Sequence, residues 1–485
     1  MKYNAALVVI VFCQHNPSGV ILLLKIVMKN LFCVENIALP VKGNGANLNF
    51  SLVSLGCPKN MVDSERMVGK LVAEGFEFIP IVDVCDFVIL NTCGFLLAAR
   101  NEARNYLNEL MQLKAVGRIK RVFVTGCWVN FEHEAARLEF PEVDAWIAVS
   151  DEINVVDVVR SFFTTTLVDH PAKADRFLLT PQHVAYLRIA DGCNRFCSYC
   201  AIPYIRGRFT SEPRETVLAE AARLIDGGTK ELIVIAQETN FWGSDLADKP
   251  TLASLLKDIL NLPGRHKIRV MYTYPVDFTD ELLDVFGNER IFSYIDLPLQ
   301  HANDTILQRM NRRVTKSQSE ELLQRIRTHL PDAVIRASFI AGFPGETDAM
   351  FGELLDFVRK WKFERGGSFA YSREPGTAAA KLDGQLPDKL IQERTDELLD
   401  VQQRIIGAWD TSRIGKRFDT ILDQAYETPD RKLIPGVFLG RTFAESADID
   451  PVVIVSGENL QVGDIIETEI VQTYEGNLIA SAIPQ

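Results

Sequence analysis

The chain has 485 residues, which is enough for several domains that each bury a core of their own. Hydrophobic residues make up 47% of it and charged residues 24%, as in ordinary globular proteins. The formal net charge of −12 argues against broad, sequence-independent nucleic-acid binding, because such binding requires a basic face. Nine cysteines in a composition of this kind indicate metal chemistry rather than disulfides.

Residues 1–46 hold two apolar runs, Ala5–Cys13 and Val20–Met28. Each run is shorter than the roughly 20 residues that span a bilayer. Ala5–Cys13 has a weak likeness to a signal peptide, but no small-residue cleavage site follows it. We interpret this segment as an extension from a translation start placed too far upstream, with Met28 as one internal candidate. We expect a cytoplasmic protein without a membrane partner. An export signal or a membrane anchor in this segment is the alternative.

Residues 47–160 alternate between strand-like and helix-like patterns. Short β-rich runs end in glycine and cysteine, and the segments between them carry apolar residues at helical spacing. This alternation predicts a domain built on an open parallel α/β sheet. The predicted strands and helices, in chain order, are Leu48–Leu55, Asn60–Glu74, Phe87–Leu90, Leu96–Leu113 and Val122–Thr125.

Three cysteines, Cys57, Cys93 and Cys127, each come just after a predicted strand of this domain and next to a glycine. The carboxyl ends of parallel strands meet at one edge of a sheet, where ligands bind. We therefore expect the three thiols to converge and to bind metal, although they are far apart in sequence. The alternative is that they are small buried hydrophobic residues, as free cysteines often are. Cys85 precedes its strand and is expected to be such a packing cysteine.

Three further cysteines, Cys193, Cys197 and Cys200, follow the strand-like run Val184–Ile189 at C-x3-C-x2-C spacing. Structural zinc and ordinary ferredoxin clusters take four protein ligands, whereas this loop offers three. Three cysteines leave one iron of a 4Fe–4S cluster open to a substrate or cofactor. The loop resembles the signature of radical S-adenosylmethionine enzymes; a zinc or redox C-x2-C pair with an extra cysteine is the alternative.

Residues 180–410 repeat the strand–helix alternation six times, which predicts a partial (β/α)6 barrel. In barrels of this kind the chemistry lies at the carboxyl ends of the strands, and the cysteine loop follows the first strand there. The six predicted strands are Val184–Ile189, Glu231–Ala236, Ile268–Tyr272, Tyr294–Leu297, Ala333–Ile340 and Gly367–Tyr371.

Polar and glycine residues follow several of these strands. Glu238 and Gln300 are suited to hydrogen-bond the ribose or the amino-acid end of a nucleoside cofactor. Gly342 and Gly345 are suited to a tight turn around a ligand. Taken singly, such a turn or a histidine such as His301 is usually structural, and only their joint position on one rim favours cofactor binding.

Three arginines, Arg206, Arg208 and Arg214, follow the cysteine loop. They are suited either to place a carboxylate or to form a solvated charged face. The sequence leaves these two interpretations open.

Residues 411–485 contain five short strand-like runs separated by turn residues, which predicts a small OB-like β-barrel. From Arg413 onward there are six basic and twelve acidic residues. That balance repels phosphates and favours a basic protein partner over nucleic acid. The predicted strands are Arg417–Leu422, Val437–Leu439, Val452–Val455, Ile465–Ile470 and Leu478–Ile483, after a helix over Lys389–Trp409.

The three parts together resemble the methylthiotransferase family of radical S-adenosylmethionine enzymes over about Phe50–Pro484. That family joins an N-terminal cluster domain, a radical barrel and a C-terminal TRAM domain. The motifs at Ser54–Asn60, Asn91–Phe95 and Asp191–Pro203 are similar to those of the branch that modifies ribosomal protein S-twelve. The acidic segment Ala447–Pro451 departs from the family pattern, and we expect this departure to bear on how a partner docks.

The resemblance implies two 4Fe–4S clusters, one held by Cys57, Cys93 and Cys127 and the other by the three loop cysteines. It implies S-adenosylmethionine both as the radical source and as the methyl donor. The implied reaction places a methylthio group on the β-carbon of an aspartate of the basic ribosomal protein S-twelve, free or on the ribosome. An electron donor such as a flavodoxin-type reductant is implied as well.

Two other functions stay open from the sequence. One is a tRNA adenosine methylthiotransferase, which a basic C-terminal domain would have favoured. The other is a non-catalytic iron–sulfur carrier. For the transferase we also expect the cysteine edge of the N-terminal domain to face the mouth of the barrel, because a carbon radical requires its sulfur partner nearby.

Overall fold

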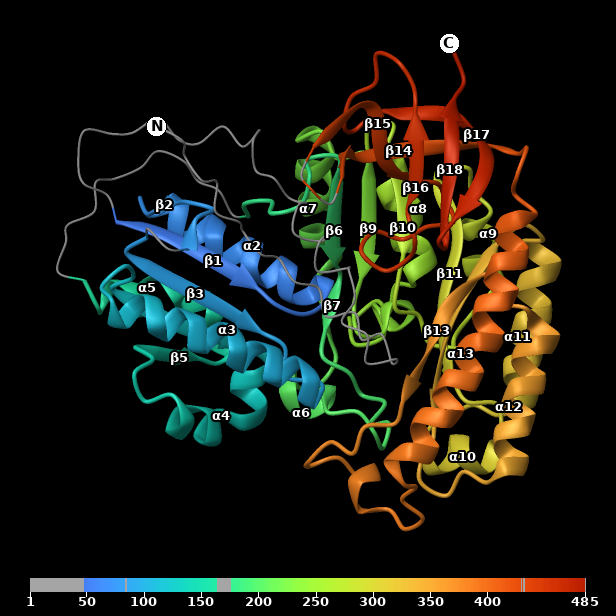
Figure 1. Ribbon diagram of the computed structural model, residues 1–485, viewed down its shortest axis with the longest axis horizontal. Helices are drawn as coiled ribbons and strands as arrows, with labels where there is room; N and C mark the ends of the chain where they lie inside the picture. Colours follow the sequence, from blue (N-terminus) through green and yellow to red (C-terminus); the bar gives the residue numbers. More distant parts are fainter. Residues whose placement is uncertain (1–47, 83–84, 164–175, 429, 431, 485) are drawn as a thin grey trace. The chain divides into compact units, whose positions relative to one another are not determined.

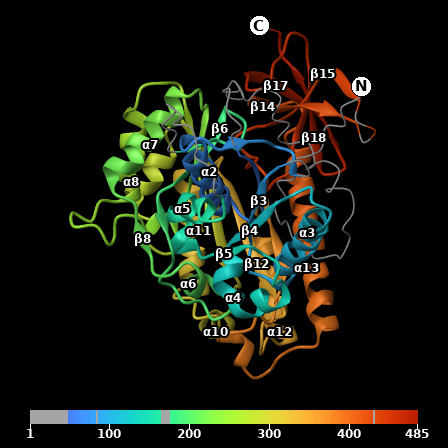
Figure 2. The same ribbon diagram turned by 90° about the vertical axis from the view of Figure 1, so that its left-hand side faces the viewer.

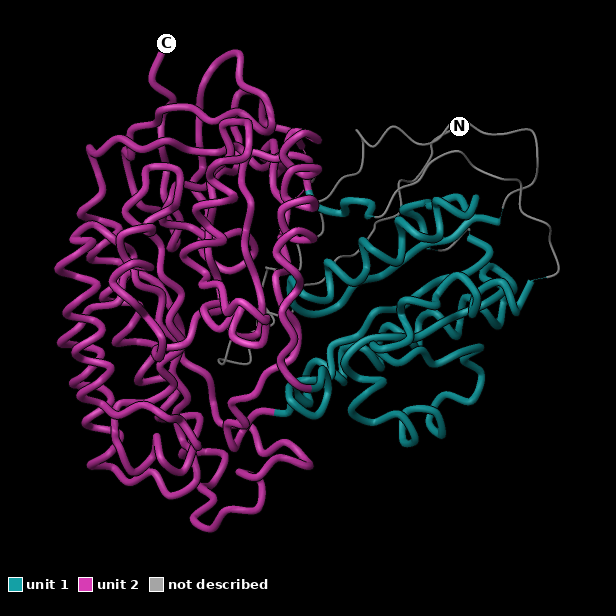
Figure 3. The backbone as a smooth tube through the Cα atoms, turned by 180° about the vertical axis from the view of Figure 1, so that it is seen from behind, with its two compact units in different colours: residues 1–13, 21–180, 201–207 teal, residues 14–20, 181–200, 208–485 magenta. Residues whose placement is uncertain are grey.

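The computed structural model describes residues 48–82, 85–163, 176–428, 430 and 432–484, so the predicted extension over residues 1–46 lies outside it. The described chain divides into two compact units (Figure 3). Unit 1 contains the described residues up to Thr180 together with Ala201–Gly207, and unit 2 contains Pro181–Cys200 and everything described from Arg208 onward. No helix in these described ranges combines the length and the apolar character needed to cross a membrane.

Unit 1 is built on a parallel sheet with the strand order β2-β1-β3-β4-β5 (Figure 1). The three strands predicted from the sequence form its centre and are confirmed. The two edge strands have only two and three residues, too few to show a periodic pattern. The strands are β1 (Asn49–Ser54), β2 (Glu77–Phe78), β3 (Phe87–Thr92), β4 (Arg121–Gly126) and β5 (Ala145–Ile147).

The two faces of this sheet bury different side chains. One face carries aliphatic residues that pack against α3 and α4, and Cys85 lies in this core, where its thiol donates to the Val82 carbonyl at 3.0 Å. Cys85 is therefore a packing cysteine, as predicted. The opposite face stacks Phe50 on Phe87, with ring centroids 5.2 Å apart. The helices are α2 (Pro58–Ala73), α3 (Leu97–Ala115), α4 (Cys127–Glu139), the 3-10 helix η3 (Val149–Asn154) and α5 (Val155–Arg160).

Unit 2 begins with six parallel strands in the order β13-β12-β11-β10-β9-β6 (Figure 1). The sheet stays open between its outer strands, so the predicted partial barrel is confirmed. Its strands are β6 (Val184–Arg188), β9 (Glu231–Ile235), β10 (Lys267–Val270), β11 (Ile291–Gln300), β12 (Val334–Ala341) and β13 (Arg365–Ala370). A two-stranded ribbon, β7 (Ala190–Asp191) with β8 (Thr210–Ser211), was not predicted because its strands are so short.

Helices follow the strands of unit 2 and cover its sheet. Several begin at a threonine or asparagine whose side chain accepts a backbone N–H of the first turn, as at Thr279, Asn303 and Thr347. The helices are α6 (Ile202–Ile205, in unit 1), α7 (Arg214–Asp226), η4 (Thr239–Phe241), α8 (Leu252–Asn261), α9 (Asp280–Phe286), α10 (Asp304–Arg309), α11 (Lys316–His329), α12 (Asp348–Trp361), η5 (Ala379–Lys381) and α13 (Asp388–Thr411).

The chain ends in a closed five-stranded barrel with the order β14-β15-β16-β18-β17, seen beyond α13 in Figure 2. Leu422, Val453, Val455 and Ile470 fill its centre. The predicted small β-barrel is confirmed, and most of its strands are longer than the apolar runs that predicted them. They are β14 (Arg417–Glu427), β15 (Leu433–Arg441), β16 (Val453–Ser456), β17 (Ile465–Tyr474) and β18 (Asn477–Ala482).

A segment of this barrel packs against the large sheet of the same unit. Tyr186 of β6 donates to Asp448 at 2.6 Å, and Tyr294 of β11 donates to Asp450 at 2.6 Å. Burial raises the pKa of Asp448 to about 6, against the effect of the Tyr186 hydrogen bond. These two carboxylates are thus used inside unit 2, and the expectation that the departure of this segment from the family pattern bears on partner docking stays a prediction.

Buried ion pairs extend the same contact. Arg365, the first residue of β13, pairs with Glu445 at 2.7 Å, and Arg441 pairs with Glu231, the first residue of β9, at 2.7 Å. Burial disfavours ionisation of Glu445, but the charges of Arg413 and Arg365 outweigh it and lower its pKa to about 2. Since these contacts lie at the amino ends of the strands, the carboxyl ends remain available for the cysteine loop.

Candidate metal centres

The three cysteines of unit 1 lie at one edge of its sheet. Cys57 is the N-cap of α2, Cys93 follows β3, and Cys127 is the first residue of α4 after β4. A Cβ on Gly56 would lie 3.0 Å from the Cβ of Cys93, and a Cβ on Gly94 would lie 2.5 Å from the backbone of Cys127. The glycines therefore let the cysteine-bearing turns approach each other, and the predicted convergence of the three strand ends is confirmed.

Asn60 links two of these thiols, and the sequence interpretation did not single it out. Its Oδ1 atom lies 3.9 Å from the Sγ of Cys57 and 3.6 Å from the Sγ of Cys127. Its Nδ2 atom donates to the carbonyl of Thr92 at 2.9 Å and to that of Leu55 at 3.1 Å. The amide thus fastens two strand ends while its oxygen points at the sulfurs. Its position in the Ser54–Asn60 motif was the only available signal.

Arg206 brings a buried positive charge to the same place. Its side chain is 1% exposed and donates to Asn60 Oδ1 and to Asp63 Oδ2, both at 2.8 Å. Ile205 and Ala201 pack directly against Cys127. Burial raises the pKa of the Cys127 thiol to about 11, and the neighbouring Arg206 opposes that rise. Arg206 therefore places a carboxylate of its own chain, which answers one of the questions that the sequence left open.

The other two arginines behave differently. Arg214 is about half exposed and pairs with Asp258 on the surface of unit 2. Arg208 is exposed and lies over the ring of Phe196, with its guanidinium carbon 4.5 Å from the ring centroid. Both arginines therefore fit the alternative interpretation, in which they form a solvated charged face.

The donor set of unit 1 fits an iron–sulfur cluster. None of the three cysteines forms a disulfide within the described residues, and two of them stand at the start of a helix, where backbone N–H groups and the helix dipole favour anions. Within the described ranges, no three histidine, cysteine or carboxylate side chains are grouped as ligands of one metal ion. A cluster differs from a single ion because each thiolate binds a different iron atom, so its ligands stand further apart.

The cysteines of unit 2 belong to one continuous loop after β6 and β7. The loop turns through left-handed backbone at Gly192 and Phe196, with φ of 73° and 51°. The Cys200 N–H donates to the Cys197 carbonyl at 3.0 Å, which closes the last turn. Burial raises the pKa of the Cys193 thiol to about 11. These thiols lie at the carboxyl end of the first barrel strand, as predicted.

The end of α10 and the residues directly after it hold this loop, and no sequence pattern indicated this contact. The N–H of Ser198 donates to the Met310 carbonyl at 2.9 Å, and its hydroxyl donates to the Arg309 carbonyl at 2.8 Å. Asn311 donates to the carbonyl of Phe196 at 2.8 Å. The loop is therefore fixed from outside itself, more than 100 residues along the chain.

Arg312 places a second buried arginine beside a candidate ligand. Its Nη1 donates to the Sγ of Cys197 at 3.7 Å, and its guanidinium carbon lies 4.2 Å from the ring centroid of Tyr274. Burial works against its charge, but Tyr199, Cys197 and Tyr274 raise its pKa well above the ordinary arginine value. Each three-cysteine site thus has a buried guanidinium beside a thiol: Arg312 contacts Cys197, and Arg206 shares the Asn60 Oδ1 acceptor with Cys127.

Two of the predicted cofactor residues have features that suit a ligand. Glu238, after β9, accepts from Arg195 Nε at 2.6 Å, while its Oε2 atom is buried without a hydrogen-bond partner. Burial raises the pKa of this carboxyl group. Gln300, at the end of β11, has a left-handed backbone with φ of 74° next to a break in strand pairing. Their assignment to cofactor binding stays a prediction.

The two predicted glycines have packing roles of their own. A Cβ on Gly342 would lie 2.7 Å from Ile391 of α13, and one on Gly345 would lie 3.1 Å from Arg309. His301 accepts the Asn303 N–H at Nδ1, so its Nε2 carries the proton and donates to Glu346 at 3.1 Å. The histidine is therefore structural. The packing explains why glycine stands at both positions and leaves their role toward a cofactor a prediction.

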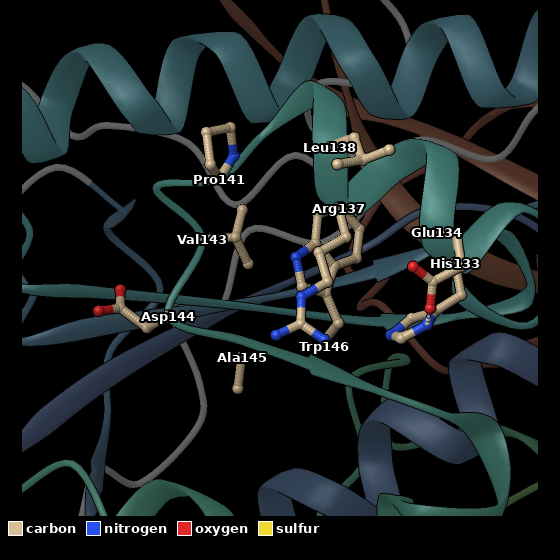
Figure 4. Close-up of a pocket in the computed structure, with 9 residues that line it drawn as sticks. All are labelled: His133, Glu134, Arg137, Leu138, Pro141, Val143, Asp144, Ala145 and Trp146. Atoms are coloured by element: carbon tan, nitrogen blue, oxygen red, sulfur yellow. Dashed lines mark ion pairs between the residues drawn. The ribbon is translucent and has the colours of Figure 1, made fainter.

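A depression of about 590 Å³ lies elsewhere in unit 1, around the end of α4 and the start of β5 (Figure 4). Ion pairs involve several of its lining residues: Asp144 pairs with Lys114 and Arg121, and His133 pairs with Glu134. None of the predicted site residues lines it, so it is separate from the cysteine sites. Its lining residues are His133, Glu134, Arg137, Leu138, Pro141, Val143, Asp144, Ala145 and Trp146.

The partial barrel, its three-cysteine loop and the appended small barrel define a radical S-adenosylmethionine enzyme with a TRAM domain. The Radical SAM superfamily matches residues 187–358, the TRAM domain residues 414–483, and Uncharacterized protein family UPF0004 residues 49–148. Among solved structures, the radical methyltransferase TsrM from Kitasatospora setae shares 14% identity at a TM-score of 0.47, covering 67% of this chain and 73% of that chain. That likeness is too weak to add to the assignment.

Curated relatives give the family. Ribosomal protein uS12 methylthiotransferase RimO from Clostridioides difficile is 36% identical over 90% of this chain and 99% of its own length. The protein of the same name from Desulforamulus reducens is 39% identical over 89% of this chain and 98% of its own length. The chain belongs to the RimO family of methylthiotransferases.

Proposed function

We propose that this protein transfers a methylthio group to the β-carbon of an aspartate of ribosomal protein uS12 and uses two 4Fe–4S clusters to do so. The observation that carries the proposal is the convergence of Cys57, Cys93 and Cys127 in a chain that also has the radical loop. A single radical cluster serves many reactions, whereas a second three-cysteine site suits the delivery of sulfur.

The reaction requires cofactor chemistry because the β C–H bond of an aspartate is not activated toward any side-chain base. When bound, the clusters and S-adenosylmethionine supply the radical, the methyl group and the sulfur. Cys193, Cys197 and Cys200 would hold the cluster that binds S-adenosylmethionine, and the unit 1 cysteines would hold the other.

The barrel residues near the loop would position the cofactor. Glu238 offers its unpartnered Oε2 atom as an acceptor for a ribose hydroxyl or an ammonium group. Arg195 fixes the other oxygen of Glu238, and the stack of Arg312 on Tyr274 closes the side of the loop near Cys197. These residues bind and orient the cofactor, and none of them has to exchange a proton with it.

The charge of the TRAM domain supports a basic protein as substrate. Glu445, Asp448 and Asp450 are used in internal contacts, yet acidic residues still outnumber basic ones on the described surface of this domain. Opposite charges on two protein partners speed their encounter and orient one partner on the other. Apart from these three residues and from Asp423, which pairs with Arg441, the acidic residues that remain half-buried or exposed there are Asp419, Glu427, Asp430, Glu458, Asp464, Glu467, Glu469 and Glu475, against Lys416, Arg417 and Lys432.

The proposal has further parts that follow from the chemistry. A radical enzyme of this kind requires a one-electron donor, for which a flavodoxin-type reductant in the cytoplasm is suitable. The unit 1 cysteine edge would face the mouth of the barrel during sulfur transfer, since the carbon radical requires sulfur close by.

Mass spectrometry of uS12 and of bulk tRNA nucleosides from a strain that lacks this protein tests the proposal. We expect uS12 to lose the mass difference between a methylthio group and hydrogen, while the tRNA nucleosides keep theirs. Complementation with the wild-type chain should restore the uS12 mass. Loss of the modification from tRNA with uS12 unchanged would contradict the proposal and favour the tRNA-modifying alternative.

A further inference from the structure

We propose that Arg206 is the positioning residue of the unit 1 cluster, and that its charge sets how tightly the cluster is held and at what potential it is reduced. The inference rests on the proposed function in one respect, since it takes Cys57, Cys93 and Cys127 as cluster ligands. It goes beyond that function by assigning the control of this cluster to a residue outside the N-terminal sheet.

The contacts of Arg206 point toward the thiols. Its guanidinium and the thiols of Cys57 and Cys127 all converge on a single atom, the Oδ1 of Asn60. Ile205, the residue before it, packs on Cys127. The guanidinium of Arg206 and two of the three candidate ligands, Cys57 and Cys127, therefore share the acceptor Asn60 Oδ1.

The charges around this point favour an anion. Three thiolates bring negative charge into a place where Cys127 is 4% exposed, and burial of an uncompensated charge is costly. The starts of α2 and α4 contribute partial positive charge there, and Arg206 contributes a full one. Asp63 opposes it through the 2.8 Å ion pair. Arg206 and Asp63 should therefore act on the cluster in opposite directions.

The segment that carries Arg206 connects the two cysteine sites along the chain. Ala201–Gly207 belongs to unit 1, whereas the residues on both sides of it belong to unit 2. The segment comes directly after Cys200, the last cysteine of the radical loop. The segment that leaves one three-cysteine site thus supplies the counter-charge of the other.

A purely structural role for the Arg206–Asp63 ion pair is the competing explanation, since the pair anchors Ala201–Gly207 to unit 1. Removal of either partner would then weaken the site in the same way. A role through charge predicts opposite signs. Loss of the cation makes the reduced, more negative cluster less favourable, while loss of the carboxylate makes it more favourable.

The test uses the full-length chain with Cys193, Cys197 and Cys200 all replaced by alanine, so that only unit 1 can take up iron. The protein is reconstituted anaerobically with iron and sulfide. Iron retained after exposure to a chelator is measured, and the midpoint potential is obtained by dye-mediated dithionite titration followed by electron paramagnetic resonance. The variants in this background are R206Q, R206K and D63N.

R121Q serves as the matched control. Arg121 also carries a buried partner, Asp144 at 2.8 Å, but it begins β4, whereas Cys127 follows the end of that strand. The substitution removes the same charge from the same unit at the opposite edge of the sheet.

We expect R206Q to retain several-fold less iron and to shift the potential to more negative values. R206K should keep most of the iron and stay near the parent potential, D63N should shift it to more positive values, and R121Q should change neither. Equal potentials in R206Q and the parent, shifts of the same sign in R206Q and D63N, or iron loss as complete in R206K as in R206Q would each overturn the inference. Absence of iron from the parent background would instead overturn the two-cluster function on which the inference rests.

Discussion

The two three-cysteine sites reach similar chemistry by different routes. In unit 2, Cys193, Cys197 and Cys200 come from one loop, and neighbours in sequence bring them together. In unit 1, Cys57, Cys93 and Cys127 come from three turns, and the order of the parallel strands brings them together. The first site depends on local backbone geometry, and the second depends on the whole sheet.

The comparison shows that both sites also need residues outside the cysteine pattern. The loop is held by the segment after α10 through Ser198 and Asn311. The assembled site is held by Asn60 and reached by Arg206, far away in sequence. Spacing alone identifies ligands, while the support around them comes from the tertiary fold.

The largest effect should follow from Cys197→Ala, which removes one ligand of the radical cluster and the thiol that Arg312 contacts. We expect both reductive cleavage of S-adenosylmethionine and formation of methylthiolated product to disappear. Chromatography of 5′-deoxyadenosine and mass spectrometry of a uS12 peptide measure the two events. Cys85→Ala is the control, since Cys85 lies in a core and is not a candidate ligand. Full loss of cleavage in the Cys85→Ala variant would contradict the assignment of the loop cysteines.

Cys57→Ala should separate the two sites. The unit 1 cluster loses a ligand, while the radical loop is intact. Cleavage of S-adenosylmethionine should therefore continue without sulfur insertion, and methylthiolated peptide should be absent. If Cys57→Ala and Cys197→Ala behave alike in the cleavage assay, the proposed division of work between the sites is wrong.

Gly94→Ala tests whether the sheet brings the unit 1 cysteines together as closely as described. The new methyl group would lie 2.5 Å from the backbone of Cys127, so the turn that carries Cys93 must shift. We expect a loss of about half of the bound iron, together with loss of product. Gly352→Ala, on α12, should leave both unchanged, because the added Cβ would meet nothing within 4 Å beyond its own stretch of helix. Full iron content in Gly94→Ala would show that the site tolerates a wider separation.

Asn311→Ala should have the smallest effect, because it removes only the hydrogen bonds that the Asn311 side chain donates to the radical loop. A hydrogen bond of this kind contributes about 0.5–1.5 kcal/mol, so we expect a modest drop in the free energy of unfolding and faster loss of loop iron to a chelator. The unit 1 iron should be unaffected when the loop cysteines are absent. Complete loss of the loop cluster would mean that the contacts from the end of α10, rather than the cysteine spacing, determine that site.

Much of the fold was predictable because its strands contain short apolar runs that are separated by helical patterns or by turn residues. The six barrel strands, the three central strands of unit 1 and the five TRAM strands all follow such patterns. The edge strands β2 and β5 were missed because two or three residues carry no period. The convergence of the unit 1 cysteines was predictable from the rule that parallel strands end at one edge.

The remaining features depend on contacts between distant residues. Arg206 was ambiguous in the sequence, since only the structure places its side chain against Asn60 and Asp63. The acidic balance of the C-terminal domain favoured a basic partner, yet two of the acidic residues counted there, Asp448 and Asp450, hydrogen-bond to Tyr186 and Tyr294 of the same unit. A charged residue that is buried by its own chain has the same sequence signature as one that awaits a partner.

The central claim is that the loop and the assembled site each hold one cluster. Iron and sulfide counted after anaerobic reconstitution test it most directly, in the wild-type chain, in a variant without the three loop cysteines, and in a variant without Cys57, Cys93 and Cys127. The account predicts that each triple variant retains half of the wild-type iron, about four atoms per chain. If one triple variant retained the full wild-type amount of iron and the other retained none, the claim of one cluster at each site would be contradicted.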